Sequence, residues 1–132
     1  MRFADTSFWF AHQDRADRRH ADTAAIVSKP MGRVVTSNHV IGETWTLIRS
    51  RLGHSVAVRF LGFLERLPDL EVVHVDEHTE IEAWRWLRRH DERRYSFVDA
   101  TSFALMRARR IREALAFGGD FIAAGFVEVR AT

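Results

Sequence analysis

Short apolar segments alternate with longer amphipathic ones along this chain, and this alternation constrains the fold more than any other feature. Five segments have the composition and the flanking turn residues of strands, at 1–5, 32–37, 70–75, 113–117 and 125–130. Helical patterns stand between or beside them, at 21–29, 38–52, 56–67, 80–94 and 96–111. Strands that alternate with helices predict an α/β fold, in which helices flank both faces of a central parallel β-sheet.

The length and residue content of the chain indicate a single domain. A chain of 132 residues can bury a sufficient core without disulfides or structural zinc, and this one has no cysteine. It has no basic leader followed by an apolar run, and no apolar stretch of membrane-spanning length. We therefore expect one domain over residues 1–132, in a cytoplasmic protein without a membrane partner.

The basic residues are almost all arginine, because Lys29 is the only lysine among the twenty lysines and arginines. Arginine binds phosphate and carboxylate groups through paired hydrogen bonds, which suits nucleic acid or an acidic partner protein. A GC-rich coding sequence produces the same bias without any function. The arginine content and the small net charge of +2 are therefore only weak support for a nucleic-acid substrate.

Isolated acids recur in apolar surroundings near the predicted ends of strands and starts of helices. Asp5 follows the first strand, and Asp120 follows the strand at 113–117. Glu43 and Asp99 are expected in the first turns of two helices. Ligands of open α/β sheets bind beyond the carboxyl ends of the strands. We therefore expect the four acids to converge on one cleft, although capping of a helix explains each acid taken alone.

A group of carboxylates of this kind favours a metal ion. Converging carboxylates repel one another and raise each other's pKa unless a cation neutralises them. Oxygen ligands without cysteine or paired histidines favour Mg²⁺ or Mn²⁺ over zinc. Such ions activate water and stabilise the charge on a phosphodiester during displacement. The residue types therefore favour metal-dependent nuclease chemistry.

The acids lie in four longer stretches, which are in order "FADTSFW", "TSNHVIGETWTLIRSR", "YSFVDATSFALM" and "EALAFGGDFIAAGF". These stretches resemble the motifs of PIN-domain ribonucleases, and specifically of the VapC toxins of bacterial toxin–antitoxin pairs. The resemblance covers almost the whole chain and implies the PIN-domain fold. It also implies the toxin of a type II system, a Mg²⁺- or Mn²⁺-dependent endoribonuclease that cleaves structured RNA such as tRNA or rRNA. A cognate VapB-type antitoxin would silence the toxin, which in this family tends to form a homodimer.

The resemblance also assigns roles to single residues. Asp5, Glu43 and Asp99 match the catalytic and metal-binding acids of the family. The supporting polar positions are matched by Thr6, Ser7 and Ser102. The first two lie beside Asp5 and would orient it, and the third lies one helical turn after Asp99.

The fourth acid is where the sequence departs from the family. The usual "TFD" after the last buried strand is "AFG" here, so Gly118 stands where an aspartate is expected. Asp120 matches a second, more variable acid, and the glycine pair before it gives the loop freedom to reorient. We expect Asp120 to take over as the fourth catalytic and metal-binding acid. The alternative is a catalytically weak PIN domain that acts as an RNA- or protein-binding module.

Two surface features have both a functional and a structural interpretation. Trp9 and Phe10 are the aromatic residues best placed for an exposed patch that contacts an antitoxin helix or a second copy. The other aromatic residues have core spacing. The run at 88–94 is a solvated helix end or, with arginines of the next helix, a basic rim for RNA phosphates. Those arginines are Arg107, Arg109, Arg110 and Arg112.

The histidines are assigned to the surface rather than to a zinc site. The ones in polar stretches are His12, His20, His54 and His90. His39 lies one helical turn before Glu43 and is also assigned to the surface. A phosphatase or receiver-like domain gathers acids in the same way, but the chain lacks the phosphate-binding lysine expected near the last strand.

Overall fold

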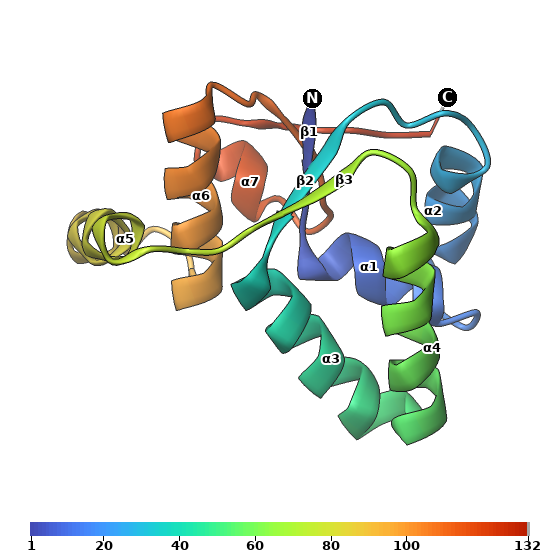
Figure 1. Ribbon diagram of the computed structural model, residues 1–132. Coiled ribbons are helices and arrows are strands. Elements are labelled where there is room, and N and C mark those ends of the chain that lie inside the picture. The colour runs from blue at the N-terminus through green and yellow to red at the C-terminus, as the bar shows by residue number, and fades with distance from the viewer. Residues whose placement is uncertain (132) are drawn as a thin grey trace.

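A computed structural model describes residues 1–131 and shows five strands and seven helices (Figure 1). The strands are β1 (Arg2–Ala4), β2 (Val34–Ser37), β3 (Leu70–Val73), β4 (Glu113–Leu115) and β5 (Val127–Glu128). The helices are α1 (Thr6–Gln13), α2 (His20–Val27), α3 (Asn38–Leu52), α4 (His54–Arg66), α5 (Glu77–Arg89), α6 (Phe97–Arg109) and α7 (Asp120–Ala123). The alternation in the sequence therefore predicted the fold class correctly.

All five strands pair in parallel, in the order β3-β2-β1-β4-β5. The chain runs outward from β1 to β3 and then returns to β4 and β5 on the other side of β1. Connections between parallel strands are right-handed, so connections that run in opposite directions along the sheet place their helices on opposite faces of it. Figure 1 accordingly shows α1, α2 and α4 on one side of the sheet and α5, α6 and α7 on the other. The reversal lies between β1 and β4, where sheets of this kind bind their ligands.

The core lies on both faces of the central strands, and it contains the aromatic residues that were expected at the surface. Trp9 is 0% exposed and Phe10 only 8% exposed, so the prediction of an apolar patch there is wrong. The Trp9 ring lies 5.3 Å from that of Phe8 and 6.3 Å from that of Phe60. Helix α1 packs against both α2 and α3, so apolar residues are needed on more than one side of it.

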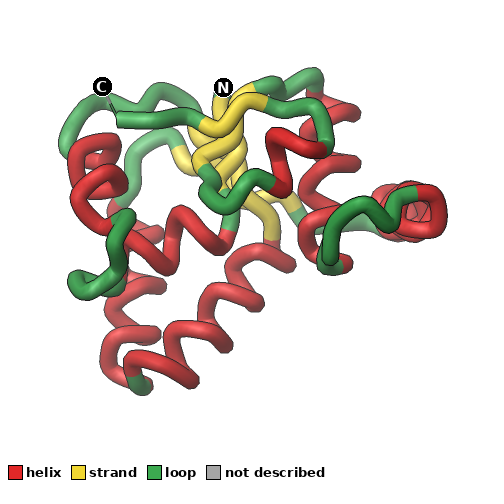
Figure 2. Tube along the Cα trace, turned by 180° about the vertical axis from the view of Figure 1, so that it is seen from behind, coloured by secondary structure: helices red, strands yellow, loops and turns green. Residues whose placement is uncertain are grey.

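Several element boundaries differ from those predicted. Helix α5 ends at Arg89 rather than near residue 94, and residues 90–96 form a loop (Figure 2). The segment at 118–124, expected as a plain connection, contains α7. Gly118 and Gly119 have φ of +100° and +91°, which ends the strand before that helix begins. Within residues 1–131, no helix has the length and apolar character needed to cross a membrane.

Candidate active site

The carboxyl edge of the sheet carries all four acids predicted from the sequence. Strand β1 ends directly before Asp5, and β4 leads to the loop before Asp120. Strand β2 leads into α3, where Glu43 lies in the second turn rather than the first. Asp99 reaches this edge because α6 runs back towards the start of β4, so its first turn lies beyond the carboxyl ends of the strands.

Asp5 is the N-cap of α1 and is only 7% exposed. Its Oδ2 accepts hydrogen bonds from the Ser7 amide at 3.2 Å and the Ser7 hydroxyl at 2.7 Å. Burial raises the pKa of Asp5 from 3.8 to about 7; the Ser7 hydroxyl opposes this rise, and the charges of Asp99 and Glu43 add to it. A cation beside this acid would favour its ionised form.

Asp99 has a similar environment at the start of α6. The Ser96 amide donates to its Oδ2 and the Asp99 amide donates to the Ser96 hydroxyl, both at 2.9 Å, which makes a capping box. Burial raises the pKa of Asp99, the Ser96 hydrogen bonds lower it, and the charges of Asp120 and Glu43 raise it. The four acids are therefore close enough for their charges to interact.

Capping and metal binding are compatible at these acids. The hydrogen bonds that residues 1–131 donate to the carboxylates of Asp5 and Asp99 all fall on Oδ2, so Oδ1 of each carboxylate accepts none. A carboxylate has acceptor capacity on both oxygens. Each acid can therefore cap its helix with one oxygen and bind a cation with the other.

The polar residues beside Asp5 connect three elements. The Ser7 hydroxyl accepts from the Phe117 amide at 3.0 Å, which ties α1 to the loop after β4. The buried Thr6 hydroxyl accepts from Thr44 of α3 at 3.2 Å, which fixes α1 against the helix that carries Glu43. The Ser102 hydroxyl instead donates to the Val98 carbonyl within α6 at 2.9 Å, so its role beside Asp99 stays a prediction.

Asp120 has a partner that the sequence did not indicate. Its Oδ1 accepts from Nε of Arg93 at 2.6 Å, and Nη2 of Arg93 donates to the Gly118 carbonyl at 2.9 Å. The buried Glu128 accepts from the Gly119 amide at 3.0 Å. No sequence signal distinguished Arg93 from the other charged residues at 88–94. Glu128, in contrast, is a single acid inside the apolar strand pattern "FVEV", and this pattern could have indicated it.

The carboxylate oxygens of the four acids suit a hard divalent cation, although the side chains do not all converge on one position. Within residues 1–131, no three acidic or histidine side chains lie close enough to make a ready metal site. The acids at the edge offer carboxylate oxygens, and burial together with mutual repulsion disfavours the ionised forms of Asp5 and Asp99. Both properties favour Mg²⁺ or Mn²⁺ as the neutralising ion.

A hollow of about 710 Å³ lies along α3 beside this edge, and Glu43, His39 and Val98 contribute to its lining. His39 is therefore part of the site's surroundings rather than a plain surface residue. Its Nε2 lies 4.0 Å from Oε1 of Glu80. His12 and His20 also differ from expectation, since both are half-buried and the His12 ring stacks on Phe63 at 4.7 Å.

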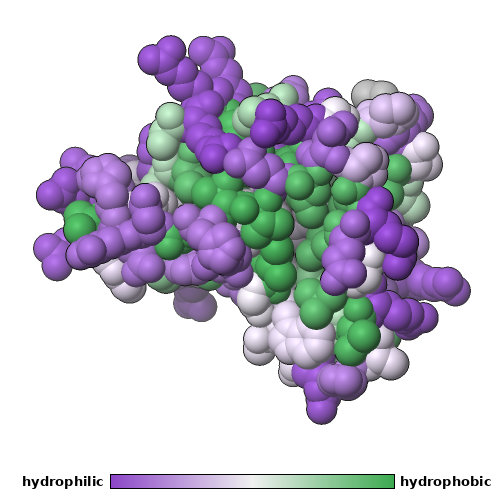
Figure 3. All heavy atoms as spheres, in the orientation of Figure 1, coloured by the Kyte–Doolittle hydropathy of each residue, from purple (hydrophilic) through white to green (hydrophobic). Residues whose placement is uncertain are grey.

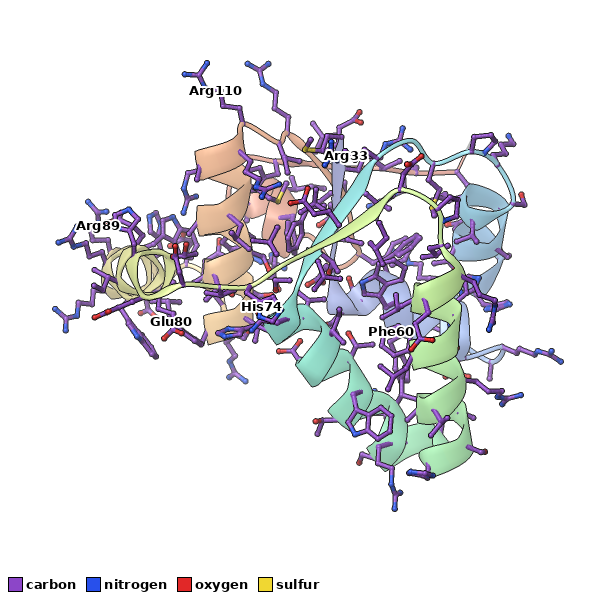
Figure 4. The ribbon with its side chains drawn as sticks, in the orientation of Figure 1. Arg33, Phe60, His74, Glu80, Arg89 and Arg110 are labelled. Atoms are coloured by element: carbon purple, nitrogen blue, oxygen red, sulfur yellow. The ribbon has the colours of Figure 1, made fainter. Side chains whose placement is uncertain are left out.

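The predicted basic rim forms only in part, because Arg89 and Arg107 line one hollow between α5 and α6 whose lining includes none of the four acids. Helix α6 has thirteen residues, about 20 Å of helix, so its last turn lies far from Asp99. Figure 4 shows Arg110 at that far end and Arg89 on α5. Arg109 there pairs with Glu71 at 2.9 Å. Within residues 1–131, Arg93 is the one arginine of the run at 88–94 with a hydrogen bond to one of the four acids.

The fold and the site define a PIN domain, and the sequence pattern of that family matches residues 2–127. The chain therefore belongs to the PIN-domain family, as a VapC-type member. It is 53% identical over 131 residues to the 23S rRNA-specific endonuclease VapC20 of Mycobacterium tuberculosis, covering 98% of each chain. It is 32% identical over 104 residues to a VapC ribonuclease of Archaeoglobus fulgidus, covering 74% of this chain and 65% of that one.

A solved structure shows the same fold. The crystal structure of Mycobacterium tuberculosis VapC20, described as a sarcin–ricin loop cleaving toxin, superposes with a TM-score of 0.92 at 52% sequence identity. The match covers 98% of this chain and 99% of that chain. The expected PIN-domain architecture is therefore confirmed.

Proposed function

We propose that this chain is the toxin of a type II toxin–antitoxin pair, a cytoplasmic endoribonuclease that depends on Mg²⁺ or Mn²⁺ and cleaves structured RNA. The observation that carries the proposal is the likeness to an rRNA-specific endonuclease over 98% of both chains. That likeness favours rRNA over tRNA as the substrate. The shared edge of four acids, three of them in the pattern of the family, supports the same activity.

Asp5, Glu43 and Asp99 would hold the ion, and Asp120 would be the fourth acid through the oxygen that Arg93 leaves free. A bound Mg²⁺ or Mn²⁺ supplies an activated water and stabilises charge on the phosphodiester. Ser7 holds the Asp5 carboxylate in one orientation through two hydrogen bonds. The contact of Thr6 with Thr44 keeps Asp5 in a fixed relation to the helix of Glu43.

A VapB-type antitoxin and a second copy of the chain are the proposed protein partners. Because Trp9 and Phe10 are buried, their contacts must use other apolar residues. Leu61 and Val72 are exposed near edge strand β3, and Trp84 of α5 is 51% exposed. Figure 3 shows apolar atoms gathered over β3 and between α3 and α4. We place the partner contacts on these surfaces.

The test is RNA cleavage by purified, antitoxin-free protein. An rRNA fragment with the sarcin–ricin loop and a tRNA are incubated with Mn²⁺, Mg²⁺ or EDTA, and Asp5→Asn is the control. We expect cleavage of the rRNA fragment with either metal and none with EDTA or in the variant. RNA binding without cleavage in any metal would refute the enzyme and support the binding-module alternative.

Growth provides an independent test of the toxin assignment. Expression of the chain alone should arrest growth, and co-expression of its small partner should restore growth. Asp5→Asn should cause no arrest. Normal growth with abundant, active enzyme and no partner would contradict the toxin assignment.

A further inference from the structure

Arg93 makes contacts at the acidic edge that neither helix capping nor core packing explains. It lies in the loop between α5 and α6, 27 residues before the acid that it binds. Its Nε donates to Asp120 at 2.6 Å and its Nη2 donates to the Gly118 carbonyl at 2.9 Å. The guanidinium is therefore anchored at two points on the loop where the chain departs from its family.

The anchored guanidinium keeps part of its binding capacity. A guanidinium has five N–H donors in a planar fork, and no residue in 1–131 accepts a hydrogen bond from Nη1 of Arg93. The side chain is 41% exposed, so a ligand can reach it from solvent. An arginine already fixed in place loses less conformational freedom when it binds a ligand.

The loop beneath Arg93 is itself held in place. Gly118 and Gly119 have positive φ, a conformation that L side chains rarely adopt. A side-chain carbon added to Gly119 would lie 3.5 Å from Nη2 of Arg93, so the guanidinium packs directly over the backbone. The Glu128 carboxylate binds the Gly119 amide on one side and Arg130 at 3.1 Å on the other.

We propose that Arg93 is a binding residue for an RNA phosphate in this site, and that Asp120 and the Gly118 carbonyl orient it. The inference rests on the proposed function, because it needs an RNA backbone at the acidic edge. Phosphate is the ligand that matches a planar cationic fork with free paired donors. A cation beside four acids also lowers the repulsion that these acids exert on an approaching phosphodiester. Asp120 then has two roles. Its Oδ1 orients Arg93, and its other oxygen acts as the fourth metal-binding acid.

The test measures RNA binding without cleavage. Every variant carries Asp5→Asn, and affinity for a fluorescein-labelled sarcin–ricin hairpin is measured by anisotropy in EDTA at fixed ionic strength. We expect Arg93→Ala to weaken binding about tenfold. Arg94→Ala removes the same charge from the neighbouring exposed residue, which makes no hydrogen bond within residues 1–131, and should cost about twofold or less. Arg93→Lys keeps the charge without the fork and should recover only part of the loss.

A double-substitution cycle tests the orienting role of Asp120. In an Asp120→Asn background, Arg93→Ala should weaken binding by only about threefold, because the anchor is already lost. Equal losses for Arg93→Ala and Arg94→Ala, or an undiminished Arg93→Ala effect in the Asp120→Asn background, would overturn the inference. Full recovery by Arg93→Lys would overturn it too. Thermal melting and calorimetric titration with Mn²⁺, both with Asp5 intact, verify that Arg93→Ala preserves the fold and the acidic edge.

The same experiments separate this inference from the proposed function. Wild-type cleavage in Mn²⁺ together with unimpaired RNA binding by Arg93→Ala would refute the phosphate site alone. Arg93-dependent RNA binding without any wild-type cleavage would refute the nuclease and leave the phosphate site standing.

Discussion

The acidic edge has two unlike halves. Asp5 and Asp99 are held from within, by the first turns of helices that pack into the core. Asp120 is held from outside, by an exposed arginine from a distant loop, over two glycines with positive φ. In the first half the acid is fixed by neighbours two or three residues away. In the second half it is fixed by a residue 27 positions away.

This difference shows where the site can change without loss of the fold. In the first half the acids also cap helices that pack into the core, so a substitution that removes the cap alters packing as well as charge. The second half consists of surface contacts and a glycine loop, so an acid can be lost at Gly118 while the strands and helices around it remain. The predictions below test this division, from the largest expected effect to the smallest.

Removal of one of the three acids that match the family should have the largest effect. Asp5→Asn, Glu43→Gln and Asp99→Asn should each abolish cleavage, because each removes a proposed metal ligand. Asp5→Asn should keep or raise the melting temperature of the metal-free protein, since asparagine caps helices about as well as aspartate and the charge repulsion is gone. Asp76 is the matched control, because it caps α5 by accepting from the Thr79 amide far from the core. Asp76→Asn should leave the cleavage rate and the melting temperature unchanged. A sharp fall in the melting temperature of Asp5→Asn would instead show that Asp5 has a structural role.

The exposed half should respond less strongly. If Asp120 is the fourth acid, Asp120→Asn should reduce cleavage by roughly 10–100-fold. Gly118→Asp should then add little activity, and its φ of +100° should cost roughly 1–2 kcal/mol of stability. Titration of cleavage with Mn²⁺ for wild type and both variants checks this. A silent Asp120→Asn together with a faster Gly118→Asp would show that the site lacks a ligand and that Asp120 has not replaced it.

The contact that joins the two halves should have a moderate effect on stability. Ser7→Ala removes the hydroxyl that donates to Asp5 and accepts from the Phe117 amide. We expect a loss of roughly 1–3 kcal/mol in the free energy of unfolding, with a smaller fall in cleavage than for Asp5→Asn. Ser28→Ala removes an exposed hydroxyl that binds only a helix carbonyl, so chemical unfolding should barely change. Equal losses for the two variants would mean that Ser7 does not couple the halves.

The smallest expected effect is the pH dependence of the metal-free protein. The folded-state pKa of Asp5 is about 7, above the ordinary value of 3.8, so between these values the folded state holds a proton that the unfolded chain has lost. The stability from this group is therefore present below pH 3.8 and is lost as the pH rises through about 7. The raised pKa of Asp99 acts in the same direction. From pH 4 to 7, wild type should lose roughly 3–8 °C of melting temperature relative to Asp5→Asn.

Metal binding should show the opposite trend. Asp5 must lose its proton to bind a cation, so calorimetric affinity for Mn²⁺ should rise over the same pH interval. A pH-independent Mn²⁺ affinity for wild type would place the ion away from Asp5.

The sequence by itself determined the layered fold and the positions of the four acids along it. Strand and helix periods are local, and the carboxyl ends of parallel strands must share an edge, so acids that follow them or begin the returning helices must meet there. The caps at Asp5 and at Ser96 with Asp99 also follow from neighbouring residues. These features needed no knowledge of long-range packing.

Only the tertiary structure decided which aromatic residues are buried and which charges are paired. Trp9 and Trp84 are both tryptophans within helices, yet one lies in the core and the other is half exposed and stacks on Phe97 at 4.2 Å. Arg93 reaches Asp120, and Glu128 reaches Gly119, because strand order and loop paths bring distant segments together. Burial and ion pairing depend on what packs against each side chain, and the periodicity of a single segment does not contain that information.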